Sequence, residues 1–111
     1  MNSTYDTDKI IVIEFVERAR KVLPGTIQHA YWFGSRSQGM GHDDSDYDVL
    51  LETVGQLSEK HRDILADIAI DLTAEHGSLL DVHAYPVDQL RHGKISRSPL
   101  VQLVHRDGVL L

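Results

Sequence analysis

The chain has 111 residues, the usual size of one domain and too short for a second substantial lobe. Acidic residues outnumber basic ones by 17 to 11, and the resulting formal charge of −6 repels a nucleic-acid backbone. These values exclude a polymerase with fingers and thumb domains and argue against non-specific binding of DNA or RNA. The chain has no cysteine and no apolar run near the roughly 20 residues of a membrane span. We therefore expect one soluble, cytoplasmic domain over residues 1–111.

The first part of the chain predicts a helix followed by a strand. Apolar residues recur at helical spacing over residues 8–23, with charged residues between them. Asp6 or Thr7 can cap the start of this helix, and Pro24-Gly25 ends it. Residues 27–33 are rich in β-branched and aromatic side chains, which is typical of a strand.

The rest of the chain continues with alternating elements. The loop at 35–45 is expected to begin with a short helical turn. We expect the later elements to be a strand at 46–53, a helix from the Ser58 cap to about 76, a strand at 78–85, a short helix from Ser98-Pro99 to about 105, and a final strand at 109–111. This order predicts an α+β fold, with a small mixed β-sheet and helices packed on it.

A glycine-serine turn follows the first predicted strand. Gly34 allows close approach to the backbone, and Ser35 offers backbone amides and a hydroxyl to phosphate oxygens. Arg36 could hold a phosphate through two hydrogen bonds. A Gly-Ser pair alone is also compatible with a simple turn.

Three aspartates strengthen the interpretation that the glycine-serine turn binds the phosphates of a nucleotide. Asp46 and Asp48 are two residues apart at the start of a predicted strand, so their carboxylates should share one face while Tyr47 points away. Asp81 lies within an apolar strand segment, where an acidic residue needs a charge partner. Three carboxylates beside a phosphate-binding turn are suited to two magnesium ions about 3.5–4 Å apart. A solvated strand start is the alternative for Asp46 and Asp48 alone.

Together these positions resemble the minimal nucleotidyltransferases (MNT) of the DNA polymerase β superfamily. The resemblance covers essentially the whole chain, including the closing segment 98–111, and implies a polymerase β-type nucleotidyltransferase core. It implies that Asp46 and Asp48 bind two Mg²⁺ ions and that Asp81 completes the catalytic metal site and helps to activate the acceptor hydroxyl. It further implies that Gly34 and Ser35 hold a nucleoside triphosphate, from which a nucleoside monophosphate is transferred as pyrophosphate leaves.

Small members of this family are commonly antitoxins that pair with an all-helical HEPN toxin. In that system the resemblance implies that AMP is transferred from ATP to a tyrosine hydroxyl of the partner. The chain departs from the family at Gln38, where a second basic residue is common, so the turn carries less positive charge.

Other interpretations remain open at this point. A binding module could neutralise its partner by contact alone, and the exposed sheet edge could instead bind a second copy of the chain. A phosphatase with an aspartate nucleophile is disfavoured because its apolar strand precedes the aspartates, whereas here the strand follows them. His83 shares the face of Asp81 and could contact a phosphate or a carboxylate, although a partly buried strand histidine is the simpler explanation.

Overall fold

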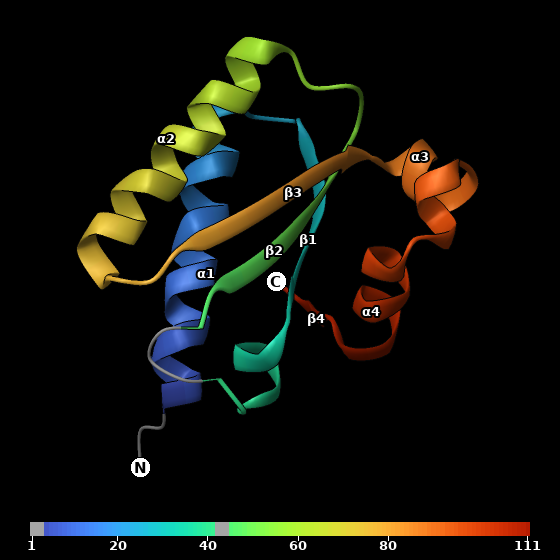
Figure 1. The fold of residues 1–111 in the computed structure, drawn as a ribbon. Coiled ribbons are helices and arrows are strands. Elements are labelled where there is room, and N and C mark those ends of the chain that lie inside the picture. Colours follow the sequence, from blue (N-terminus) through green and yellow to red (C-terminus); the bar gives the residue numbers. More distant parts are fainter. Residues whose placement is uncertain (1–3, 42–44) are drawn as a thin grey trace.

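A four-stranded mixed sheet forms the centre of the computed structural model, which describes residues 4–41 and 45–111 (Figure 1). The order of the strands across the sheet is β3-β2-β1-β4. β1 pairs antiparallel with both β2 and β4, whereas β2 pairs in parallel with β3. The helical and strand elements are α1 (Thr4–Val22), β1 (Ile27–Phe33), the 3₁₀ turn η1 (Ser35–Gln38), β2 (Tyr47–Thr53), α2 (Glu59–His76), β3 (Leu80–Pro86), α3 (Val87–His92), the 3₁₀ turn η2 (Lys94–Arg97), α4 (Pro99–Asp107) and β4 (Val109–Leu110).

Helices cover both faces of the sheet. α1 and α2 pack on one face, where side chains such as Phe15, Trp32 and Leu72 form the larger core. α3 and α4 pack on the other face around a smaller core that contains Phe33, Leu50 and further apolar side chains (Figure 1). This arrangement confirms the α+β prediction, with a small mixed sheet and helices on it.

The predicted elements are present, and two short helical elements, α3 and η2, were not predicted. α3 begins directly after Pro86, which ends β3 and serves as the residue before the helix. Asp88 lies in its first turn and Arg91 in its last, which is the charge pattern that helix ends favour. α3 has only six residues, which is too few for a helical repeat of apolar positions to be recognised in the sequence.

Capping residues fix the ends of the longer helices. The Ser58 hydroxyl accepts a hydrogen bond from the backbone N–H of His61, and the Ser98 hydroxyl accepts one from Val101. Gly77 ends α2 in the left-handed conformation. α1 begins earlier than expected, so Asp6 lies within its first turn and not before it. None of the helices in the described part of the chain combines the length and apolar character needed to cross a membrane.

Candidate functional site

Asp48 and Asp81 lie side by side on the face of the sheet that carries α3 and α4. β2 and β3 run in parallel, and their register places Asp48 directly opposite Asp81. Both residues are the second in their strands, while the preceding Tyr47 and Leu80 point into the core on the opposite face. The connection through α2 therefore brings together two carboxylates that are 33 residues apart in the sequence (81 − 48).

The surroundings of Asp48 raise the pKa of its carboxyl to about 6. Burial of the carboxyl is the largest cause, followed by the negative charges of Asp81 and Asp46, while His83 acts in the opposite direction. A half-buried pair of like charges favours a cation between or beside them, because a cation stabilises the ionised form. Carboxylate oxygens are the donors that Mg²⁺ prefers, so this pair fits a magnesium site.

Asp46 lies immediately before β2 and is exposed. It is close enough for its charge to raise the pKa of Asp48. A role for Asp46 as a metal ligand stays a prediction.

His83 joins the acidic pair from the next position on the same face of β3. Its Nε2 lies 3.4 Å from Oδ2 of Asp81. Ligand atoms of Asp48, Asp81 and His83 all lie within 4.8 Å of one another. The ring of His83 also lies 5.9 Å from the ring of Phe33, centroid to centroid, which limits where the imidazole can turn. Its two-residue spacing from Asp81 was the only sequence signal for this placement.

Gly34 sits directly against the carboxylate of Asp48. Phe33 is paired with Asp48 across β1 and β2, so the residue that follows Phe33 reaches this carboxylate. The backbone of Gly34 has a φ of +84°, and a Cβ atom added there would collide with Oδ2 of Asp48. Glycine is therefore required at this position for two reasons: the backbone conformation favours it, and Asp48 occupies the space that a Cβ atom would need.

The turn after Gly34 is a short 3₁₀ helix that starts at Ser35. Ser35 is exposed, whereas the Ser37 hydroxyl donates a 2.6 Å hydrogen bond to the carbonyl oxygen of Gly34. The carbonyl oxygen of Ser35 accepts a bond of 3.0 Å from the Met40 N–H, which closes the turn. Ser35 thus stands at the start of a compact turn, next to the glycine that contacts Asp48. The remaining loop positions 42–44 lie outside the described residues.

Arg36 occupies a different position from the one expected of a phosphate ligand. Its side chain is only 3% exposed, and Nη1 donates a 2.9 Å hydrogen bond to Oδ1 of Asp8. Nε donates to the carbonyl oxygen of Ser45 and Nη2 to the hydroxyl of Ser78. The guanidinium also lies 4.4 Å from the centre of the Tyr47 ring. In this structure its charge and donors fix the loop, and a role for Arg36 in nucleotide binding stays a prediction.

Asp8 is the residue at this site that sequence reasoning missed. It is 4% exposed, and Oδ1 accepts hydrogen bonds from both Arg36 and the hydroxyl of Tyr47. These partners are 28 and 39 residues away along the chain, so no local spacing relates them. The only available signal was an acidic residue on the apolar side of a predicted helix.

Gln38 connects the turn to the end of α4. Its amide Nε2 donates a 2.7 Å hydrogen bond to the carbonyl oxygen of Asp107, and it lies 3.1 Å from the hydroxyl of Ser37. The residue that departs from the family pattern thus has a structural role here. Glutamine holds the turn against the C-terminal segment without adding charge to it.

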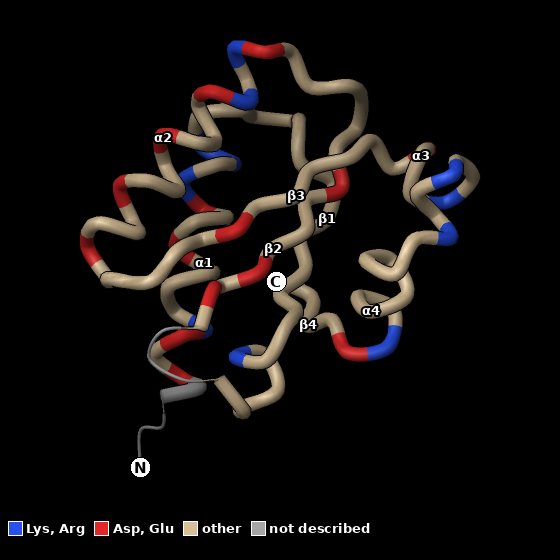
Figure 2. Tube along the Cα trace, viewed as in Figure 1, with Lys and Arg blue, Asp and Glu red and all other residues tan. Residues whose placement is uncertain are grey.

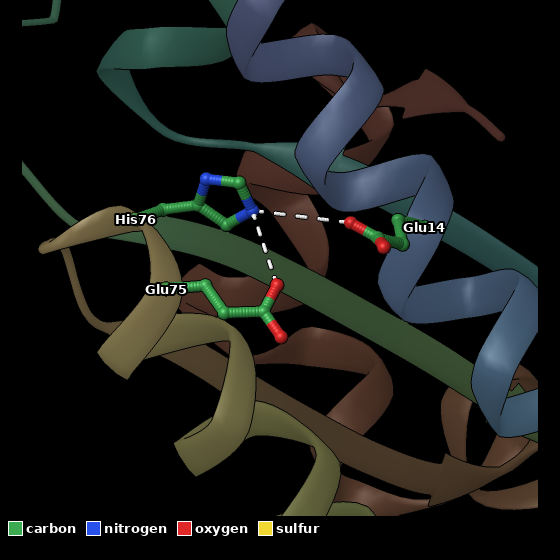
Figure 3. A group of neighbouring side chains, drawn as sticks. All are labelled: Glu14, Glu75 and His76. Atoms are coloured by element: carbon green, nitrogen blue, oxygen red, sulfur yellow. Dashed lines mark ion pairs between the residues drawn. The ribbon is translucent and has the colours of Figure 1, made fainter.

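The second cluster of possible metal ligands lies on the other side of the molecule, where α1 meets α2. Figure 3 shows Nε2 of His76 between the carboxylates of Glu14 and Glu75, at 3.9 Å from each. The guanidinium of Arg18 lies 2.9 Å from Glu14 and 3.7 Å from Glu75. This arginine already balances the acidic charge, so we interpret the cluster as an exposed salt-bridge network between the two helices.

A pocket of about 530 Å³ lies farther along the sheet face that carries the acidic pair. Its floor includes Tyr31, Leu50 and Glu52, and its walls come from α3, η2 and α4. Glu52 is 9% exposed and binds Nδ1 of His29 at 2.8 Å. In the strand register Phe33 pairs with Asp48, and His83 pairs with Leu50, which lines the pocket. The pocket therefore lies beside the acidic pair on the same face, although Asp48, Asp81 and His83 are not among its lining residues.

No protein-family model matches the chain, and no curated protein matches it by sequence. Solved structures do match. The chain is similar to a toxin-antitoxin structure determined with AMP-PNP, at 25% identity and a TM-score of 0.61, over 87% of this chain and 69% of that one. It is also similar to a mutant form of a toxin-antitoxin complex of MntA with its toxin, at 26% identity and a TM-score of 0.59, over 86% and 68% of the two chains.

Two further structures share the fold at lower identity. One is a tri-AMPylated HEPN toxin from Shewanella oneidensis in complex with its MNT antitoxin, with 19% identity, a TM-score of 0.57, and coverage of 96% of this chain and 71% of that chain. The other is a protein from Sulfolobus solfataricus provisionally assigned as a nucleotidyltransferase, with 20% identity, a TM-score of 0.53, and coverage of 99% and 87%. The α+β architecture is thus the one found in nucleotidyltransferase structures.

Proposed function

Because this chain has the fold of the MNT-type nucleotidyltransferase antitoxins, we propose that it is a magnesium-dependent nucleotidyltransferase that modifies a helical partner protein. The donor is ATP, and the acceptor is a hydroxyl, most simply a tyrosine of a HEPN-type toxin. The observation that carries the proposal is the direct pairing of Asp48 with Asp81 beside Gly34. The AMP-PNP of one similar structure and the AMPylated toxin of another support the choice of donor and acceptor.

Each residue of the site has a distinct part in this proposal. Asp46, Asp48 and Asp81 would hold two Mg²⁺ ions, with His83 orienting Asp81 through the contact between Nε2 and Oδ2. Bound magnesium would neutralise the phosphate charge that builds up during the transfer. The backbone at Gly34 and the exposed Ser35 would bind the terminal phosphates.

The transfer itself is an in-line displacement. The acceptor oxygen forms a bond to the α-phosphorus as the bond from that phosphorus to its bridging oxygen breaks, and pyrophosphate leaves. Asp81 lies at the outer strand of the sheet and would accept the hydroxyl proton. Asp48, which is held between Gly34 and Asp81, has less freedom to move.

Mass measurement tests this proposal directly. The chain is mixed with the helical protein encoded next to it, ATP and magnesium, and both proteins are weighed. We expect the partner to gain the mass of one or more AMP groups. Asp48→Asn and Asp46→Asn should abolish this gain while the circular dichroism spectrum stays unchanged. Full transfer by both variants would rule out the proposed metal site.

A second candidate is an antitoxin that acts by binding alone. Arg36 is engaged with Asp8, and Gln38 is bound to the backbone of Asp107, so neither adds charge for a triphosphate. Nucleotide binding must then depend on the metal ions and backbone amides, which favours weak affinity. If the double variant Asp46→Asn/Asp48→Asn still neutralises the toxin in cells, binding without transfer becomes the better description.

A further inference from the structure

An apolar groove runs between α2 and the outer strand of the sheet. It has a volume of about 450 Å³ and a mainly apolar lining that includes Ala66, Ala69, Ile70, Ala74, Leu79 and Val82. Ile70 and Leu79 are 64% and 53% exposed, which is unusual for large apolar side chains next to each other. The small alanine side chains of the groove leave room for the backbone of another helix or strand to approach closely.

The strand beside the groove is open along one side. Among the described strands, β3 is at the end of the order and pairs only with β2. Leu80 and Val82 line the groove, whereas Asp81 between them faces the acidic site on the opposite face of the sheet. A protein seated in the groove would therefore cover the edge of the strand that carries Asp81.

Acidic residues lie on α2 beside the groove. They recur at every fourth position and are all exposed: Glu59, Asp63, Asp67 and Asp71. The next in this series, Glu75, belongs to the salt-bridge network with Arg18 between α1 and α2. Figure 2 shows these positions in red along α2. Asp63, Asp67 and Asp71 form no ion pair with any residue that the structure describes. The lysine and arginine of α2 are confined to its first turn, at Lys60 and Arg62.

We propose that this groove binds an amphipathic helix of a partner protein, with an apolar ridge flanked by lysine or arginine. The apolar lining matches the ridge, and the acidic row matches the basic flank. A second copy of this chain is disfavoured because it would place one acidic row against another. The proposal rests on the proposed function in one respect: the docked helix belongs to the protein that presents its hydroxyl to Asp81.

The test uses a helical peptide of about 18 residues with leucines at three- and four-residue spacing and lysines on both flanks. A second peptide carries glutamate in place of the lysines. Binding is measured by calorimetry and by amide chemical shifts of the ¹⁵N-labelled chain. Neither nucleotide nor magnesium is present, so failure of the proposed transfer reaction does not affect the result.

Two matched variants locate the binding surface. Ile70→Ser removes an apolar side chain from the groove, whereas Ile10→Ser removes one of 65% exposure from α1. We expect the lysine peptide to bind wild-type protein and Ile10→Ser equally, and Ile70→Ser about tenfold or more weakly. Shifts should cluster on α2 and β3. The glutamate peptide should bind about tenfold or more weakly than the lysine peptide.

Charge variants test the acidic row separately. Asp67→Asn/Asp71→Asn should weaken the lysine peptide several-fold and reduce its sensitivity to salt, whereas Asp88→Asn on α3 should not. Absence of binding to wild-type protein, equal affinity for both serine variants, or shifts centred elsewhere would overturn the proposal. An Ile70-dependent dimer in sedimentation would assign the groove to a second copy and would overturn it as well.

The partner protein links the groove to the transfer reaction. With the helical partner as acceptor, Ile70→Ser should raise KM for that protein about tenfold and leave nucleotide binding unchanged. If wild-type protein binds the peptide but transfers no AMP, the transfer proposal fails and the docking site stands. If wild-type protein transfers AMP and Ile70→Ser leaves KM unchanged, the docking site fails and the transfer proposal stands.

Discussion

Gly34 and Asp48 depend on each other, because the carboxylate occupies the space that a larger residue at position 34 would need. This is a property of two residues 14 positions apart (48 − 34), and it places a backbone turn against a carboxylate. Any side chain at position 34 must displace Asp48 or distort the turn. Steric exclusion at this pair therefore maintains the site.

Gly34→Ala should destabilise the protein by more than the cost of its backbone conformation. Gly39 in the same turn also has a positive φ, of +72°, but a Cβ there meets nothing within 4 Å. Gly39→Ala should cost about 1 kcal/mol, and Gly34→Ala clearly more. Urea unfolding measures both. The backbone of Gly34, at φ +84° and ψ −177°, is also in a region that is essentially open to glycine alone, so part of its cost is independent of Asp48. In an Asp48→Ala background Gly34→Ala should cost clearly less than in the wild-type background, and an unchanged cost would contradict the steric explanation.

The raised pKa of Asp48 predicts how stability depends on pH in the metal-free protein. A carboxyl whose pKa rises from 3.8 to about 6 on folding binds more protons in the folded state between these values. The ionised carboxylate therefore destabilises the fold above about pH 6, and this penalty is relieved as the pH falls through 6 towards 3.8.

Asp48→Asn removes that ionisation. Discounted for solvent screening at a half-buried group, the gain in the free energy of unfolding should be about 1 kcal/mol at pH 8, fading below pH 6. Thermal unfolding in EDTA over this pH range provides the measurement. Asp88→Asn, at an exposed position on α3, serves as the control. A stability difference that does not change with pH would contradict the assignment.

At the scale of elements, the buried pair of Arg36 and Asp8 joins the turn η1 to α1. The same guanidinium binds the backbone before β2 and the hydroxyl of Ser78 before β3. One side chain thus connects the start of both acidic strands to the first helix. The result is that the loop around Gly34 is fixed by this one side chain.

Breaking this pair from one side should destabilise the fold strongly. Arg36→Met leaves Asp8 buried without its charge partner, and we expect a loss of about 3–5 kcal/mol in the free energy of unfolding. The double variant Asp8→Leu/Arg36→Met removes both charges and should lose much less than the sum of the two single variants. Additive losses in a double-mutant cycle would show that the two residues act independently.

At the scale of the whole molecule, ligand binding should stabilise the fold because the site draws on several elements. Asp48, Asp81 and Gly34 come from β2, β3 and the turn after β1, and these elements meet only in the folded chain. A ligand present at about 100 times its dissociation constant adds roughly 2.7 kcal/mol.

AMP-PNP with magnesium should therefore raise Tm, and AMP-PNP with EDTA should raise it much less. In Asp48→Asn the magnesium-dependent part should vanish. Glu75→Gln, in the cluster between α1 and α2, should leave it intact. Equal stabilisation with and without metal would contradict a magnesium-dependent site.

The sequence by itself determined the order of the elements, the α+β class and the positions of Gly34, Ser35, Asp46, Asp48 and Asp81. Such features are local. They depend on neighbouring positions, as do helical periodicity, capping residues, turn residues and the two-residue repeat of a strand. The nucleotidyltransferase fold that the resemblance implied is confirmed by the solved structures. The metal and nucleotide roles of the individual residues stay predictions. The helix α3 was not predicted because its six residues are fewer than two helical turns and leave too little periodic signal.

Only the tertiary structure decided what each charged side chain faces. Arg36 was expected at a phosphate but is buried against Asp8, and the contact of His83 with Asp81, one of the contacts that the sequence left open, is present in the structure. The groove along α2 likewise depends on β3 being the outer strand. Burial and charge pairing are set by residues distant in sequence, and the free energy of desolvating an ion depends on all of them together. That dependence is why spacing could identify the carboxylates and could not identify the pairing of Arg36 with Asp8.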